Sequence, residues 1–167
     1  ALRNMQAGIG HATMIAALSR SLQSDPEKVL SAYSLRPDLG CIAALAQRQK
    51  LNGVTFQPKV PTRFMLFRYS DPVMPGCFLP KYTGLRVQVH KIKNEVLIFT
   101  SQLRNITIAL GSISRMVGEI ESDFVAEAEL KSFYDRGIKN KMICSQAEML
   151  RYINRRKRIG FLCCLVI

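Results

Sequence analysis

The candidates for catalytic or ligand-binding roles in this chain are its charged residues. Histidine occurs only as His11 and His90, and the five cysteines include no CxxC pair, so the sequence argues against a zinc site and a disulfide framework. Glu127 and Glu129 are two positions apart in a segment that alternates like a strand, which predicts two carboxylates on one face, exposed to solvent or lining a site. A basic run could contact nucleic-acid phosphates or could be a solvated helix end. It comprises Arg155, Arg156, Lys157 and Arg158.

The net charge of the chain favours a polyanionic partner. Its 167 residues include 24 Lys and Arg against 12 Asp and Glu, a net charge of +12. Such a surplus is typical of proteins that bind nucleic acid or an anionic membrane surface, although a basic protein without such a partner fits equally well. The longest apolar run, Phe161 to Ile167, is too short to span a membrane. The odd number of cysteines predicts a reducing, cytoplasmic setting.

The elements that would hold these side chains begin with helices in the first fifty residues. Asp25 stands directly ahead of Pro26, an arrangement that caps and starts a helix, and Asp38 is placed to cap another. Apolar residues recur at helical spacing before the first cap, at Met14, Ile15, Leu18 and Leu22. Prolines and glycines then interrupt residues 51–76, which we predict to be a linker that leads into a second domain.

The second domain is expected to open with an antiparallel hairpin. Leu85, Val87 and Val89 alternate with polar residues, which is the pattern of a half-buried strand whose outer face carries Arg86, Gln88 and His90. A second strand is predicted from Val96 to Thr100. The polar turn between the two predicted strands favours their direct antiparallel pairing.

A helix and further strands are expected after this hairpin. Residues 105–118 predict a helix, and residues 124–130 alternate again. That alternation puts Glu127 and Glu129 on the face opposite Phe124, Ala126, Ala128 and Leu130. Ser145 opens a capped helix that runs into the basic residues, and residues 161–167 predict a buried strand. Because no closing element follows that strand, we expect the sequence to be a piece cut from a longer protein.

Residues 78–91 carry the most specific motif in the chain. They read FLPKYTGLRVQVHK, which resembles the nucleotidyl-lysine motif of archaeal-type ATP-dependent DNA ligases, K-Y-D-G-x-R followed by V-Q-x-H-K. Residues 94–107 resemble the next stretch of that family, E-V-x-I-F-[ST]-R-R-L-E-N-I-T. A single KxxGxR would say little, because it also occurs by chance.

Further matches keep the order of the family's motifs along nearly the whole chain. Upstream, residues 59–66 resemble the P-V-R-P-M-L segment that precedes the catalytic domain, and residues 32–34 and 38–40 resemble the last helices of the DNA-binding domain. Downstream, residues 143–158 resemble the Q-x-E-x-L-R-Y-I-N-R-R helix. The chain is therefore identified as similar to these ligases.

The resemblance implies a set of site residues. Lys81 matches the lysine whose amine attacks the α-phosphate of ATP and is adenylylated. Arg86 matches an arginine that contacts the nucleotide. Glu129 matches a carboxylate that binds the ribose or helps to hold Mg²⁺, with Glu127 as its neighbour on the same face. ATP and Mg²⁺ are the implied cofactors, and nicked duplex DNA is the implied partner.

The sequence also departs from the family's pattern within this set. Thr83 stands where the family has aspartate, and Leu79 stands where it has an acidic residue. Ser101 and Gln102 replace two arginines, and Ala128 replaces a glycine. Because each charge-assisted contact to a ligand contributes substantially to binding, their combined loss should lower adenylylation by orders of magnitude.

The fold class that follows from these patterns is α+β. We expect residues 1–50 to be C-terminal helices of a DNA-binding domain, residues 51–76 a linker, and residues 77–167 the N-terminal part of an antiparallel-rich nucleotidyltransferase (adenylation) domain. The exposed edges of an incomplete sheet favour self-association.

The function implied is that of a DNA ligase acting in replication, repair and recombination. Such a ligase seals nicks in duplex DNA through a lysyl-AMP intermediate, and we expect weak or no activity from this chain by itself. The alternative is a non-catalytic, basic nucleic-acid-binding module derived from a ligase. A third interpretation, an RNA ligase or capping enzyme, is opposed by the R-Y-I-N-R-R helix.

Overall fold

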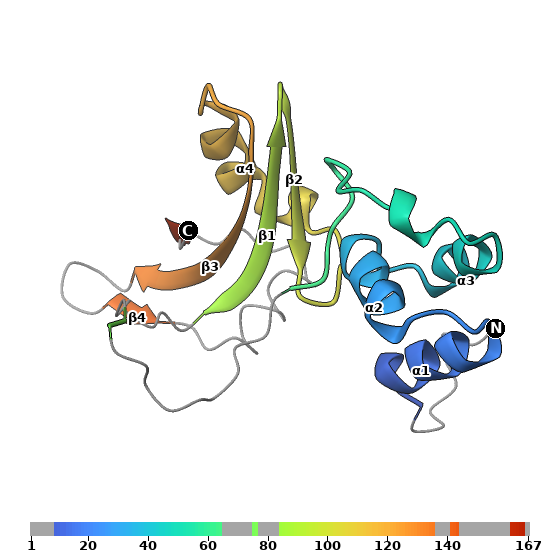
Figure 1. Cartoon of the computed structure of the whole chain (residues 1–167). Helices are drawn as coiled ribbons and strands as arrows, with labels where there is room; N and C mark the ends of the chain where they lie inside the picture. Colours follow the sequence, from blue (N-terminus) through green and yellow to red (C-terminus); the bar gives the residue numbers. More distant parts are fainter. Residues whose placement is uncertain (1–8, 65–74, 77–83, 136–140, 144–160, 166–167) are drawn as a thin grey trace. The chain divides into compact units, whose positions relative to one another are not determined.

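Two compact units make up the chain, residues 1–63 and residues 64–167. The computed structural model describes residues 9–64, 75–76, 84–135, 141–143 and 161–165 (Figure 1). In this part of the chain, no helix is long and apolar enough to cross a membrane.

The first unit is helical, as the sequence predicts. It contains α1 (His11–Ser21), α2 (Pro26–Leu35), α3 (Leu39–Gln47) and the 3-10 turn Leu51–Gly53. Their apolar faces form one core, whose buried members are Ile15, Val29, Ala32, Tyr33, Ile42, Ala46 and Leu51.

Both predicted helix caps are present. The Asp25 carboxylate accepts a hydrogen bond of 3.0 Å from the Glu27 backbone N–H, and Pro26 occupies the first turn of α2. The Asp38 carboxylate accepts one of 3.0 Å from the backbone N–H of Cys41 in α3. Each cap satisfies a backbone donor that the helix leaves unpaired, which contributes about 1 kcal/mol.

The first unit continues into the segment predicted as a linker. Leu51 is only 9% exposed and belongs to the helical core, with Val54 packed partly against it. Further along, the Arg63 backbone N–H donates a hydrogen bond of 2.8 Å to the Ser34 carbonyl. Residues 51–63 are therefore anchored to the helices that precede them.

The second unit is built on an antiparallel sheet of five strands. These are β1 (Leu85–Ile92), β2 (Glu95–Thr100), β3 (Phe124–Asp135), β4 (Lys141–Ile143) and β5 (Phe161–Leu165). The order is β2-β1-β3-β4, and β5 also pairs with β3. The predicted hairpin is confirmed as β1 and β2. Of the buried strand expected at residues 161–167, residues 161–165 form β5, and the last two residues and the burial of the segment lie outside the description. With the helices of the first unit, these strands confirm the α+β class.

One face of the sheet carries the core of this unit. The 3-10 turn η3 (Thr107–Leu110) and helix α4 (Gly111–Gly118) occupy the segment predicted as a helix, and they pack on this face (Figure 1). Ala128 and Leu130 are buried on the core face of β3, as the alternation predicts. The other buried members are Leu85, Val87, Val89, Val96, Ile98, Ile106, Leu110, Ile113 and Val117.

The expectation that β1 is half-buried was wrong, because its second face is also covered. Gln88 is 3% exposed and His90 is fully buried. β1 is paired along both edges, by β2 and by β3, so side chains of two neighbours flank it. The Phe99 ring of β2 packs edge-on against His90 at a centroid distance of 5.3 Å. Of the residues on this face of β1, Arg86 remains partly exposed.

Candidate functional site

The polar face of the sheet brings together three of the residues singled out from the sequence. Arg86 lies directly opposite Glu129 in the antiparallel register, and Gln88 lies opposite Glu127. Side chains opposite one another in such a pair point to the same face, and their β-carbons are about 5 Å apart. Arg86, Glu127 and Glu129 therefore form one cluster, although Arg86 and Glu127 are 41 positions apart in the sequence.

Arg86 is held from two sides. Its guanidinium Nη2 donates to Glu127 Oε2 in an ion pair that runs diagonally across the strands. The side chains are 26% and 29% exposed, so solvent screens the pair only in part. The Arg86 guanidinium also lies over the ring of Phe64, with its central carbon 5.6 Å from the ring centroid, within the range of a cation–π contact.

Glu129 presents a carboxylate oxygen that nothing in the described residues satisfies. Its Oε2 is buried and has no hydrogen-bond partner there. Buried polar atoms are nearly always hydrogen-bonded, since burying one without a partner costs free energy. A hydroxyl donor or a cation from a ligand would satisfy this oxygen.

Gly84 explains how the chain approaches this carboxylate. A β-carbon at Gly84 would lie 3.1 Å from the carbonyl carbon of Leu130, still nearer to the carbonyl oxygen, and 3.2 Å from Glu129 Oε2. Only glycine leaves room for this approach. The glycine of the KxxGxR motif thus lies against the β3 backbone, directly beside Glu129.

The turn after β2 opens at the same end of the sheet. Thr100 is the last residue of β2 and pairs with Val87, one position from Arg86. The Leu103 N–H closes the turn by donating a 2.7 Å hydrogen bond to the Thr100 carbonyl. Ser101 and Gln102 are exposed in this turn, so two of the departures from the ligase motifs are found next to the Arg86 end of β1.

His90 lies on the same face, as the alternation predicts, but its burial was not predicted. His90 Nε2 is 2.8 Å from Gln88 Oε1, and burial lowers the pKa of His90. The histidine is therefore neutral near pH 7, and its Nε2–H donates to the amide oxygen. No signal in the sequence separates this buried pair from two exposed polar residues, because period-2 alternation looks the same in both cases.

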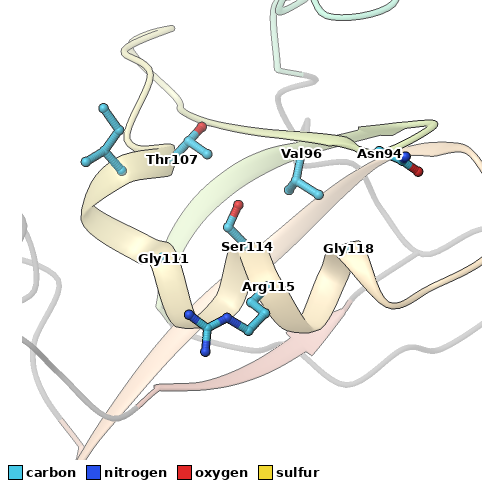
Figure 2. A pocket seen from close by; sticks show the side chains of 8 residues that line it. Asn94, Val96, Thr107, Gly111, Ser114, Arg115 and Gly118 are labelled. Carbon is cyan, nitrogen blue, oxygen red and sulfur yellow. The ribbon is translucent and has the colours of Figure 1, made fainter.

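A concavity in the second unit is separate from this cluster (Figure 2). It measures about 500 Å³ and lies between β2 and the helical segment η3–α4. Its lining includes Val96, on the face of the sheet opposite Arg86. Figure 2 shows the Arg115 side chain extending away from Val96, so the concavity does not gather converging charged groups. We therefore place the candidate site at Arg86 and the two glutamates.

Several predicted site residues lie outside the described part of the chain. These are Lys81, Arg155, Arg156, Lys157 and Arg158. Among the residues that the structure describes, no group of three or more His, Cys, Asp and Glu side chains could hold a metal ion. Glu127 and Glu129, predicted as weak metal ligands, therefore have no third such ligand there.

Comparison with known proteins finds archaeal DNA ligases. The chain is 31% identical to the DNA ligase of Methanosphaera stadtmanae over 137 residues, which is 75% of this chain and 25% of that protein. It is 31% identical to the DNA ligase of Methanothermobacter thermautotrophicus over 141 residues, 77% of this chain and 25% of that protein. It is also 31% identical to the Archaeoglobus fulgidus DNA ligase over 122 residues, 67% of this chain. No family model matches the chain. The chain spans about a quarter of the length of these curated relatives.

Proposed function

Because the chain is related in sequence to archaeal DNA ligases, we propose that it carries part of the adenylation site of an ATP-dependent DNA ligase. The observation that best supports this proposal is the buried, unpartnered Glu129 Oε2 beside Gly84, with Arg86 opposite Glu129 on the neighbouring strand. A cation beside an unpartnered acceptor suits a nucleotide, which offers phosphate oxygens and ribose hydroxyls.

Lys81 is the proposed nucleophile of this site. It precedes Gly84 by three residues, and Gly84 contacts the wall formed by Glu129 and Leu130. In the proposed reaction the neutral lysine amine attacks the α-phosphorus of ATP. A nitrogen–phosphorus bond forms, the bond to pyrophosphate breaks, and the amine loses a proton. In a complete ligase the AMP would then move to the 5′-phosphate of a nick, where the 3′-hydroxyl displaces it.

Arg86 and Glu129 are the proposed nucleotide-binding residues. The Arg86 guanidinium would stabilise negative charge on phosphate, and Glu129 Oε2 would accept a ribose hydroxyl or bind Mg²⁺. Carboxylate oxygens suit Mg²⁺, which usually takes one or two of them together with substrate phosphates. Because Glu127 is engaged by Arg86, Glu129 fits this role better. When bound, the ion would neutralise charge on the phosphates.

The proposed partner is nicked duplex DNA. The helices of the first unit would be the C-terminal helices of a DNA-binding domain, and Arg155 to Arg158 would contact DNA phosphates. The net charge of +12 supports a polyanionic partner. We further propose a cytoplasmic location and self-association through exposed sheet edges.

The second candidate function is a non-catalytic nucleic-acid-binding module. It is favoured by Ser101 and Gln102, which leave the turn beside Arg86 without the two arginines of the ligase motif. Retention of Lys81, Gly84 and Arg86 favours the nucleotidyltransferase site.

Nucleotide binding separates the two candidates. We would titrate the chain with ATP by calorimetry, with Arg86→Ala as the test variant. Arg115→Ala, in α4 and outside the cluster, is the matched control. The proposal predicts weak ATP binding that Arg86→Ala reduces and Arg115→Ala leaves unchanged. Binding to DNA without any binding of ATP would favour the non-catalytic module.

A further inference from the structure

Two consecutive residues join the helical unit to the sheet unit, and each is anchored to its own unit. Arg63 ends the first unit, and its guanidinium lies over the Tyr33 ring with its central carbon 5.5 Å from the centroid. Phe64 begins the second unit, and its ring lies under the guanidinium of Arg86 at 5.6 Å. Each of the two residues therefore packs within its own unit, through a cation over a ring in each case.

The contact at Phe64 is made with the central cation of the candidate site. The ligase motif P-V-R-P-M-L has proline where this chain has Phe64, so the ring is a feature of this sequence. Glu127 fixes one part of the Arg86 guanidinium through an ion pair, and the ring of Phe64 offers a flat, electron-rich surface to its plane. An arginine restrained by both contacts loses less rotamer freedom when it binds a phosphate.

We infer that Phe64 is a positioning residue for Arg86 within the second unit. This inference rests on the proposed function for its nucleotide, but the positioning itself concerns only residues of this chain. Without the Phe64 ring, Arg86 would keep its ion pair with Glu127 but lose the aromatic surface against its guanidinium.

The first test observes Arg86 directly in the full chain. Nitrogen-15 relaxation of the Arg86 Nε–Hε group by NMR reports how strongly the side chain is restrained. Phe64→Leu keeps an apolar side chain but removes the aromatic face, so it should shift this signal and increase its motion. Phe64→Tyr keeps the face and should restore the wild-type signal. Phe56→Leu, the same change at an exposed phenylalanine of the first unit, should leave the signal as in the wild type.

The second test measures ATP affinity with the same variants. Phe64→Leu should weaken binding by roughly fivefold to tenfold, in line with the strength of a partly buried cation–π contact. Phe64→Tyr and Phe56→Leu should bind as the wild type does. If Phe64 had a merely structural role, Phe64→Leu would not change the Arg86 signal and Phe64→Tyr would not restore ATP binding together with that signal.

The outcomes separate the inference from the function on which it rests. An Arg86 signal that is the same in Phe64→Leu and in the wild type would overturn the inference, whatever happens to ATP binding. If Arg86→Ala and the wild type bind ATP alike while Phe64→Leu still loosens Arg86, the nucleotide assignment fails and the positioning stands.

Discussion

Gly84 lies so close to Leu130 that a β-carbon on the glycine would stand 3.1 Å from the carbonyl carbon and nearer still to the oxygen. This approach fixes the start of β1 against β3 at the point where Arg86 faces Glu129. The glycine of the motif therefore has a structural reason in this fold, in addition to any part it has in binding a ligand.

Gly84→Ala should destabilise the second unit by about 1–3 kcal/mol, because either the added methyl group or the Leu130 backbone must move. The free energy of unfolding, measured with urea, tests this. Gly111→Ala is the control, because a β-carbon there meets nothing within 4 Å and the residue is helical. It should be neutral or slightly stabilising. Equal effects of the two variants would mean that the Gly84 contact is not tight.

Glu129→Gln should weaken ATP binding without lowering the free energy of unfolding. It removes the negative charge from a side chain whose Oε2 is buried without a partner, so the free energy of unfolding should stay constant or rise by up to about 1 kcal/mol. ATP binding should fall, because the site loses its open anionic acceptor. Thermal unfolding and calorimetry on the same preparation give both values. A marked loss of stability would show that Glu129 has a structural partner instead.

The stability of the second unit should decrease below about pH 6.5, the ordinary pKa of histidine, because of His90. Burial lowers the pKa of His90 in the folded state, so the unfolded state binds more protons between the two pKa values. The contribution is fully present above pH 6.5 and is lost as the pH falls toward the folded pKa, by at most about 1.4 kcal/mol per pH unit.

His90→Gln should reduce this pH dependence. Urea unfolding at several pH values between about 4 and 8 would measure the slope for the wild type and the variant. Identical slopes for the two proteins would mean that another group carries the acid sensitivity.

Ser101→Arg should strengthen ATP binding more than Gln102→Arg. Thr100 pairs with Val87, so the next residue continues toward Arg86, and alternation turns Gln102 to the other face. One new charge-assisted contact should improve the affinity about tenfold. Calorimetric titration of both variants is the measurement. A larger increase in ATP affinity from Gln102→Arg would show that, in the turn beyond Thr100, residue 102 and not residue 101 faces Arg86.

Local patterns predicted those parts of the fold that depend on neighbouring residues. The caps at Asp25 and Asp38, the hairpin and the two faces of residues 124–130 were all confirmed. Each is set by helix termini or by the two-residue period of a strand, which operate within a few positions of the chain.

Features that depend on distant residues were not predicted from the same patterns. The burial of Gln88 and His90 depends on side chains of neighbouring strands such as Phe99. The ion pair of Arg86 with Glu127 depends on a strand register between segments 41 positions apart. The ring contact of Phe64 with Arg86 joins a loop to a strand. Periodicity assigns a residue to a face, but it does not say what covers that face.

Incubation of the purified chain with ATP and Mg²⁺, followed by intact mass and peptide mapping, tests the central claim most directly. The account predicts a small covalent AMP adduct, well below one per chain, that maps to Lys81 and disappears in Lys81→Ala. A chain shown to be folded that gains no AMP and does not bind ATP would contradict the account. It would leave a nucleic-acid-binding module descended from a ligase.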